Sequence, residues 1–320
     1  MPAGGRTAPL DKGVGQIRLL TGCAGLALIL ATSAWAAAEP RLSALIWTAP
    51  GHEVAALTRQ PAMCSKAKAD DADVLIGEAL FNAPMLLGGQ AARADISCAS
   101  CHSNGRRNPH FRLEGVSAGP GTADVSSSFF SPARANGRFD PKPIPDLAYP
   151  GRISRAPTTG DLERFLRGLI VEEFSGREPS RSALSALAAY VSAIGDCGAV
   201  QEQPRRLADQ VLLVRLSVMA AGRLIASGET ETAAIAVAGA RHQLGLIDER
   251  YAGASLDRER GQLLAASRAL QPIAQSRAPD PAELQRWLAG FDRVLVPLLR
   301  RSEARSLYSE ARAVRRVRQD

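Results

Sequence analysis

The five residues Cys98-Ala99-Ser100-Cys101-His102 constrain the fold of this 320-residue chain more than any other segment. Two cysteines three positions apart lie on one face of a helical turn, so both thiols can bond to the two vinyl groups of one haem. The histidine that follows can then reach the iron as an axial ligand. The motif therefore predicts a single covalently attached haem c, with Cys98 and Cys101 as attachment sites and His102 as the proximal iron ligand.

Two other interpretations of a Cys-x-x-Cys segment fit the rest of the chain less well. A structural zinc site needs four ligands, and the sequence has no second Cys-x-x-Cys to supply the other pair. A thioredoxin-like dithiol needs an alternating α/β pattern, which the hydrophobic residues of this chain do not show. Haem attachment remains the interpretation that uses both cysteines and the histidine.

The first 38 residues have the pattern of an export signal. Basic residues precede an apolar run over residues 19–35, and the small residues that end it offer cleavage after Ala36 or Ala38. We therefore predict export to the bacterial periplasm and removal of a signal peptide, residues 1–38. The alternative is an uncleaved membrane anchor, because the apolar run approaches the ~18–20 residues needed to span a bilayer.

Two of the five cysteines remain once the export signal and the haem motif are set aside. Cys64 lies before the motif and Cys197 lies well after it. Disulfides form in oxidising compartments, and one between these two residues would close a long loop around the haem segment. We treat Cys64 and Cys197 as a disulfide candidate, since the sequence does not show whether they meet.

Composition favours helices over sheets. Aromatic residues make up only 5% of the chain, while alanine and leucine, which lose little side-chain entropy in a helix, are abundant. The formal net charge is +7, from 39 basic and 32 acidic side chains. This excess favours acidic partners, but no nucleic-acid-binding motif accompanies it, and we expect no nucleic-acid partner.

The region that contains the motif has little regular periodicity. Residues 39–70 show no clear period, a short helix is expected over residues 71–81, and residues 104–159 are rich in turn-forming Gly, Pro, Ser and Asn. Such a long irregular stretch is unusual in a compact domain, but it fits a domain whose core is completed by a haem. We predict a c-type haem domain over residues 39–200.

Helical patterns dominate the rest of the chain. One amphipathic helix is expected to begin at Asp161, and another is expected over residues 183–194. Four further apolar stripes follow, the clearest over residues 284–299. Amphipathic helices with short connections predict an antiparallel helical bundle over residues 201–320, so the expected fold class is mostly α.

The segment around the motif resembles the haem domain of class I cytochromes c. Gly77 and Phe81 are placed like the glycine and the aromatic residue of the first helix in that fold, which crosses a final helix similar to residues 184–194. More narrowly, the stretches IGEALFNAPMLLGG and ISCASCHSNGRRNP are similar to a haem segment of the bacterial di-haem cytochrome c peroxidase and MauG-like family. The resemblance covers roughly residues 72–196 and implies a class I-like haem domain.

The chain departs from the peroxidase family in several places. That family carries two haem motifs, and this sequence has one. A family segment that often reads aromatic, His, Asp, Gly here reads Tyr149-Pro150-Gly151-Arg152. The sequence also has no methionine between Met85 and Met219. A distal histidine or methionine is therefore not evident.

The sixth iron ligand is left open by these departures. The candidates are His52, Met63, Met85, His110 and Tyr149. A vacant position is a further alternative, and it suits peroxide chemistry, whereas a His/Met pair suits electron transfer. Glu172 and Glu173 could supply acid–base chemistry beside a vacant site, but a solvated helix face beside Arg164 and Arg167 is the simpler explanation.

The motif, the export signal and the resemblance together predict an exported c-type cytochrome with one haem, which exchanges electrons with a redox partner protein. The first alternative is a peroxidase-like haem enzyme with an open distal iron site. The second is a haem sensor that binds a partner through its C-terminal helices. The missing second motif argues against a self-contained di-haem peroxidase, and membrane contact is expected only through an uncleaved signal anchor.

Overall fold

The computed structural model describes residues 42–66, 71–131, 133–149, 151, 153–156, 158–195, 198–276 and 278–318. The chain divides into two compact units, Met1–Ala38 and Glu39–Asp320, and every described residue belongs to the second. The predicted signal peptide and its alternative, an uncleaved anchor, lie outside the described residues. Within the described part, no helix is both long enough and apolar enough to cross a membrane.

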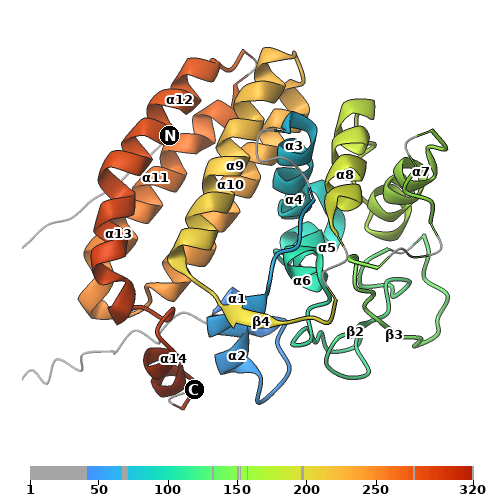
Figure 1. The fold of residues 1–320 in the computed structure, drawn as a ribbon, viewed down its shortest axis with the longest axis horizontal. Helices are drawn as coiled ribbons and strands as arrows, with labels where there is room; N and C mark the ends of the chain where they lie inside the picture. The colour runs from blue at the N-terminus through green and yellow to red at the C-terminus, as the bar shows by residue number, and fades with distance from the viewer. Residues whose placement is uncertain are drawn as a thin grey trace, which may run out of the picture. The chain divides into compact units, whose positions relative to one another are not determined.

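Helices make up most of the described chain, which confirms the predicted mostly α fold class (Figure 1). Before residue 200 they are α1 (Ser43–Ile46), α2 (Glu53–Thr58), α3 (Ala72–Phe81), α4 (Pro84–Leu87), α5 (Gly89–Arg93), α6 (Cys98–Cys101), η1 (Ser103–Gly105), α7 (Asp161–Gly168), η2 (Leu169–Glu173) and α8 (Arg181–Ala193). After it they are α9 (Leu207–Ala226), α10 (Thr230–Arg250), η3 (Ala254–Leu256), α11 (Asp257–Gln275), α12 (Pro281–Gly290), η4 (Phe291–Leu295), α13 (Val296–Ser302), η5 (Glu303–Arg305) and α14 (Glu310–Val317). Of the short turns, η2 and η4 are π-helical.

The described residues also contain short strands that pair two by two. β1 (Arg59–Pro61) runs antiparallel to β4 (Glu202–Pro204), and β2 (Thr122–Ala123) runs antiparallel to β3 (Lys142–Pro143). Residues 39–70, for which the sequence shows no period, thus contain α1, α2 and β1. Elements this short have too few residues to establish a hydrophobic period, so their existence depends on the segments they contact.

α3 and α8 cross closely, and Gly77 lies at the crossing. α3 begins at Asp71, whose side-chain oxygen accepts hydrogen bonds from two backbone N–H groups of the first turn. A Cβ added to Gly77 would lie only 2.0 Å from the Ala186 carbonyl oxygen, so only glycine lets the two backbones approach this closely. The helices predicted over residues 71–81 and 183–194 are both present, with small shifts at their ends.

The region before residue 200 has its own apolar core, called the N-terminal core below. Phe81 of α3 and Tyr190 of α8 pack with ring centroids 5.1 Å apart, and Phe130 packs edge to face against Phe174 at 5.0 Å. The long segment between α6 and α7 contributes Phe111, Leu113, Val116, Ala123, Phe130, Ile144 and Ala148 to this core. Apart from β2, β3 and short turns, the described residues of that segment have no regular structure, as the sequence predicts.

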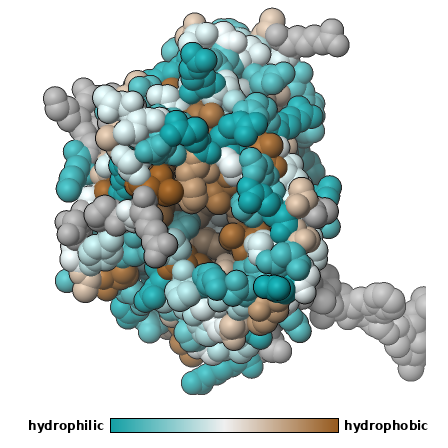
Figure 2. All heavy atoms as spheres, turned by 90° about the vertical axis from the view of Figure 1, so that its right-hand side faces the viewer, coloured by the Kyte–Doolittle hydropathy of each residue, from teal (hydrophilic) through white to brown (hydrophobic). Residues whose placement is uncertain are grey.

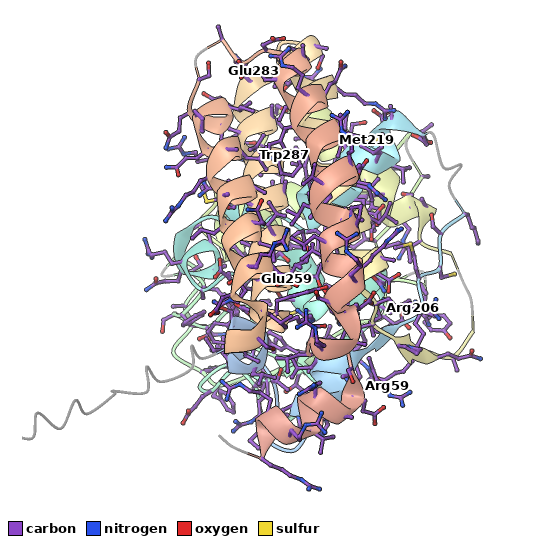
Figure 3. The ribbon with its side chains drawn as sticks, turned by 90° about the vertical axis from the view of Figure 1, so that its left-hand side faces the viewer. Arg59, Arg206, Met219, Glu259, Glu283 and Trp287 are labelled. Atoms are coloured by element: carbon purple, nitrogen blue, oxygen red, sulfur yellow. The ribbon has the colours of Figure 1, made fainter. Side chains whose placement is uncertain are left out.

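The C-terminal helices, α9 to α13, pack around a second core, called the C-terminal core. α9 contacts α10 and α12, and α11 contacts the same two helices, so the four form a closed set. α12 begins at Asp280, whose Oδ1 accepts a hydrogen bond from the Ala282 N–H at 2.8 Å. Trp287 of α12 reaches α11, where its Nε1 donates to the Ala266 carbonyl at 3.1 Å, and its ring stacks on Phe291 (Figure 3).

α3 contributes to both cores. Leu75 and Ala79 belong to the C-terminal core, whereas Leu80 and Phe81 belong to the N-terminal core. Figure 1 shows α3 between α8 and the pair α9 and α10, and α3 contacts α8, α9 and α10 directly. Residues 39–320 thus form one compact unit, and the domain boundary expected between residues 200 and 201 stays a prediction.

Candidate haem-attachment site

The Cys-x-x-Cys part of the motif forms a single helical turn, α6. The side-chain oxygen of Ser100 accepts a hydrogen bond from the backbone N–H of Ser97 at 3.0 Å, which caps the start of the turn. Asn108 holds the other end, because its backbone N–H donates to the Cys101 carbonyl at 2.9 Å and its Nδ2 donates to the Ser100 carbonyl at 2.8 Å. The turn therefore presents the two half-buried cysteines, both free thiols, on one face.

The thiols of Cys98 and Cys101 lie in apolar surroundings. Both side chains pack against the N-terminal core. Burial raises the pKa of each thiol to about 12, and the neighbouring Cys98 adds to the effect on Cys101. Thiols that act as nucleophiles or metal-binding thiolates have lowered pKa values in electropositive surroundings. This environment does not suit a reactive dithiol.

His102 follows the turn, is half-buried, and has one buried ring nitrogen that is unused. Its Nδ1 has no hydrogen-bond partner among the described residues, and its ring centroid lies 6.4 Å from that of Phe81. Burial lowers the pKa of His102 to about 4, although the Pro145 backbone carbonyl and the Asp146 carboxylate act in the opposite direction. The imidazole is therefore neutral at pH 7, which is the form that binds a metal ion.

Gly105, three residues after His102, lets the end of α8 close on the site. Its φ of +73° is in the left-handed region, and an added Cβ would lie 2.5 Å from Ile194 Cδ1. Its carbonyl accepts a hydrogen bond from the Leu147 N–H at 3.2 Å. The end of α8 and the loop around residue 147 are thereby held next to the motif.

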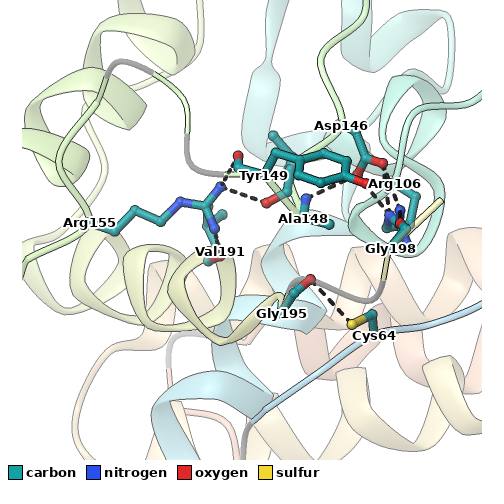
Figure 4. A network of polar contacts seen from close by, with 10 residues as sticks. Cys64, Arg106, Asp146, Ala148, Tyr149, Arg155, Val191, Gly195 and Gly198 are labelled. Carbon is teal, nitrogen blue, oxygen red and sulfur yellow. Dashed lines mark hydrogen bonds and ion pairs between the residues drawn. The ribbon is translucent and has the colours of Figure 1, made fainter. Parts of the chain in front are cut away.

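A buried ion pair fixes the loop near His102 (Figure 4). Arg106, which is 1% exposed, donates from Nε to Asp146 Oδ1 and from Nη2 to Asp146 Oδ2, both at 2.8 Å. Asp146 also accepts from the Ala148 N–H at 3.0 Å. Although partial burial raises the pKa of Asp146, the hydrogen bonds from Arg106 and Ala148 outweigh it and hold the pKa below its usual value. Asp146 is therefore an anchored anion near the imidazole.

A second arginine ties the same loop to α8. Arg155 Nη2 donates to the Leu147 carbonyl at 2.6 Å and to the Tyr149 carbonyl at 3.3 Å, while Nη1 donates to the Val191 carbonyl at 3.2 Å (Figure 4). Neither this arginine nor the Arg106 ion pair is predicted by a pattern in the sequence. A segment rich in turns has no periodicity that would show which of its side chains meet.

The face that carries α7 and the β2–β3 segment is hollowed, and hydrophobic residues lie in the recess (Figure 2). Several apolar side chains that pack against the N-terminal core are only partly buried: Cys98, Cys101, Phe129, Leu147, Ile153, Val171, Phe174 and Leu184. Contiguous apolar patches on a surface, unlike single exposed apolar residues, mark sites that a ligand or partner covers. The thiols, the imidazole and their apolar surroundings therefore fit a covalently attached haem.

The two histidines among the sixth-ligand candidates meet each other. His52 Nδ1 lies 3.0 Å from His110 Nδ1, and His110 Nε2 lies 2.8 Å from Glu202 Oε1. These contacts use both ring nitrogens of His110. The other candidates, Met63, Met85 and Tyr149, have exposed side chains. None of these contacts joins a candidate to His102, so the sixth ligand stays open.

Glu172 and Glu173 end the π-helical turn η2 and have different surroundings. Glu172 is an exposed partner of Arg134 and also lies 3.7 Å from Arg167. Glu173 is only 18% exposed, and its Oε1 lies 3.8 Å from Arg134. Its Oε2 is buried without a hydrogen-bond partner in the described part of the chain. The solvated helix face expected from the sequence thus describes Glu172 but not Glu173.

Cys64 is disulfide-bonded. Its segment pairs with the end of α8, because Ser65 forms a β-bridge with Ile194 and the Gly195 N–H donates to the Cys64 carbonyl at 3.1 Å. The Cys64 sulfur lies 3.2 Å from the Gly195 carbonyl oxygen (Figure 4). Cys197, the predicted partner, lies outside the described residues, so the pairing stays a prediction that the neighbouring backbone supports.

Within the residues that the structure describes, no group of three or more His, Cys, Asp or Glu side chains is arranged to hold a metal ion. No protein-family model matches the sequence, and comparisons with curated proteins and with solved structures give no significant match. The assignment of a function therefore rests on the motif and on the geometry around it.

Proposed function

We propose that this chain is an exported c-type cytochrome, with one haem c attached through Cys98 and Cys101 and ligated by His102. The observation that carries the proposal is the α6 turn. It presents two free thiols in apolar surroundings, followed directly by a half-buried, neutral imidazole with an unused ring nitrogen. A site that uses thiolates would instead need positively charged surroundings, which stabilise the thiolate and lower its pKa. The haem, when bound, supplies one-electron redox chemistry.

The arrangement of α3 and α8 supports a class I-like fold for the haem domain. In that fold a glycine and an aromatic residue of the first helix cross the last helix. Here Gly77 lies against Ala186, and Phe81 packs against Tyr190. We therefore propose that residues 39–200 are the haem domain and that residues 201–320 form an antiparallel helical bundle beside it.

The residues around the motif have separate tasks in this proposal. Cys98 and Cys101 would hold a haem through thioether bonds, each thiol adding across a vinyl group with its hydrogen going to the second vinyl carbon. His102 is kept neutral by burial, and Asp146, anchored by Arg106, lies near enough to favour a proton on the imidazole. Such carboxylate or carbonyl partners orient ligating histidines. The apolar residues around the recess exclude water, which is one control on a reduction potential.

A peroxidase-like enzyme is the second candidate. Its support is that two of the sixth-ligand candidates, His52 and His110, are engaged with each other and with Glu202. Glu173 also keeps a buried carboxylate oxygen without a partner in the described part of the chain, and this oxygen could hold or move a proton. Either function requires a redox partner protein, as electron donor or acceptor.

Covalent attachment is tested on purified protein by haem staining of a denaturing gel. We expect Cys98→Ala/Cys101→Ala to carry no stained haem, because both attachment points are gone. Ser100→Ala is the matched control, since it alters the same helical turn but keeps both thiols, and it should stain like the wild type. Stained haem in the double variant would contradict the proposal.

Ligand binding separates the carrier from the peroxidase. A carrier with a filled sixth position should be low-spin in both oxidation states and should not respond to carbon monoxide or hydrogen peroxide. The peroxidase should bind carbon monoxide when reduced and change its ferric spectrum quickly with peroxide. In that case Glu173→Gln should slow the peroxide response and Glu172→Gln should not, because only Glu173 has a buried carboxylate oxygen.

A further inference from the structure

A cavity of about 290 Å³ lies between the N-terminal segment, the outer side of α6 and the C-terminal helices. Ala99 and Ser100 of the haem motif form part of one wall, and residues of α9 and α10 form part of the opposite wall. Arg205 and Arg250 both line this cavity. The proposed attachment of haem uses none of these four side chains, so the cavity needs a separate explanation.

Arg250 is a deeply buried cation on the last turn of α10. It is only 3% exposed. Its Nη1 donates to the Leu246 carbonyl at 3.1 Å, and its guanidinium carbon lies 5.5 Å from the centroid of the Tyr308 ring. Its Nε is buried and has no hydrogen-bond partner among the described residues. No ion pair with a described carboxylate neutralises this arginine.

Arg205 brings a second positive charge into the same cavity. Its backbone N–H donates to the Thr58 carbonyl at 2.7 Å, which fixes the residue between β4 and α9. Its side-chain Nε is buried and has no partner in the described part of the chain. Burial lowers the pKa of Arg205 to about 9, and the charge of Arg250 acts in the same direction. Arg205 therefore remains a cation at pH 7, close to a like charge.

The acidic side chains of the cavity are engaged elsewhere. Asp209 Oδ2 accepts hydrogen bonds from Gln60 Nε2 at 2.8 Å and from the Arg206 N–H at 3.0 Å. Asp95 Oδ1 lies 3.8 Å from the Nδ1 of His242. Asp209 is near enough to favour the charged form of Arg205, but it makes no ion pair with it. Neither arginine thus has an ion-pair partner among the described residues, although the Asp209 carboxylate is near Arg205.

We propose that this cavity is a binding site for a small oxyanion, a carboxylate or a phosphate, held between Arg205 and Arg250. Buried charges are normally paired, and a buried donor without an acceptor is unfavourable. An oxyanion would supply acceptors to both Nε–H groups and would neutralise two like charges at once. The planar guanidinium of arginine matches carboxylate and phosphate oxygens better than the point charge of lysine does.

The test is isothermal titration calorimetry of the purified protein with inorganic phosphate and, separately, with succinate. Chloride keeps the ionic strength constant. We expect saturable binding of one equivalent of at least one of the two anions. Binding of phosphate alone identifies the ligand class as phosphates, and binding of succinate alone identifies it as carboxylates. No binding of either anion at millimolar concentration would overturn the proposal.

Substitutions of the two arginines test whether the anion binds in this cavity. Arg205→Met and Arg250→Gln should each weaken binding at least tenfold, whereas Arg286→Met, which removes an exposed arginine of α12, should leave the affinity unchanged. Arg205 makes no side-chain hydrogen bond to a described residue, so Arg205→Met should be at least as resistant to thermal unfolding in chloride as the wild type. That result separates loss of the site from loss of the fold. Unchanged affinity in Arg205→Met would overturn the proposal.

Discussion

The two cores of this protein hold together in different ways. The C-terminal helices bury regular apolar stripes against one another, and positions such as Val214, Leu244 and Leu299 have no exposed surface. The region before residue 200 has a long irregular segment that is fixed by buried polar contacts such as the Arg106–Asp146 ion pair. Its face is also hollowed, with hydrophobic residues in the recess (Figure 2). Both cores have partly buried apolar side chains at their margins, and we infer that a haem in the recess completes the N-terminal core.

Loss of the haem should therefore have the largest effect of the changes considered, and the effect on amide protection should be confined to the region before residue 200. In Cys98→Ala/Cys101→Ala, we expect faster amide hydrogen exchange in α3, α6, α8 and the segment between α6 and α7, because the recess is no longer filled. The amides of α10 and α11 should keep their protection. Exchange read by mass spectrometry measures both regions in one sample, with Ser100→Ala as control. Equal protection of the two regions in the double variant would contradict the inferred difference.

The Arg106–Asp146 and Arg260–Asp248 ion pairs give a second comparison of the two regions. Arg106→Met leaves Asp146 without its partner in a buried place, and we expect a loss of about 3–5 kcal/mol in the free energy of unfolding. The matched control is Arg260→Met in α11, since Arg260 pairs with Asp248 at a partly exposed site. Exposed pairs contribute about 0–1 kcal/mol. Urea unfolding of both variants measures the difference, and similar losses would show that the Arg106 pair is not the anchor of its loop.

Two glutamates, the half-buried Glu78 and the buried Glu259, differ between the two regions. Glu78 of α3 has no carboxyl partner among the described residues, and burial raises its pKa to about 7. Glu259 of α11 accepts a hydrogen bond from Ser302, and this bond, with Arg305 close by, holds its pKa below the usual value despite burial (Figure 3). The N-terminal region thus prefers a neutral carboxyl at Glu78, whereas the C-terminal helices prefer a carboxylate at Glu259.

The smallest expected effects follow from these pKa directions. A glutamate has a pKa of about 4.3 in the unfolded chain, so the favourable contribution of Glu78 is present below that pH and is lost as the pH rises through about 7. Glu78→Gln should therefore make the protein more stable than the wild type at pH 8 and should have little effect at pH 4. Glu259→Gln should destabilise at pH 7, with a difference that shrinks as the pH falls below about 4. Thermal unfolding of both variants and the wild type across this pH range is the measurement. A Glu78→Gln variant less stable than the wild type at pH 8, or a Glu259→Gln variant more stable than the wild type at pH 7, would contradict the assignment.

The sequence was informative where a pattern repeats or where a motif has fixed spacing. The stripe over residues 284–299 predicts the helix that runs through α12 and η4 into α13. The resemblance to class I cytochromes c implies a helix crossing at Gly77 and Phe81, and α3 meets α8 at those residues. The motif predicts which atoms would hold a haem, although its occupancy stays a prediction.

Other features depend on contacts between distant segments, which no local pattern shows. β1 and β4 are three residues each and pair across most of the N-terminal region. Arg106 meets Asp146 only because the turn-rich segment folds back on itself. Arg205 and Arg250 lie in different segments of the chain, so the sequence does not show that they line the same cavity. Tertiary packing, rather than propensity, decides each of these cases.

The most direct test of haem attachment is the intact mass of the denatured protein, combined with the absorption spectrum of its alkaline pyridine complex. The proposal predicts one haem retained per chain after denaturation, a spectrum typical of two thioether bonds, and no alkylation of Cys98 or Cys101. A denatured chain that has the mass of the polypeptide alone, with both of these thiols alkylated, would contradict it.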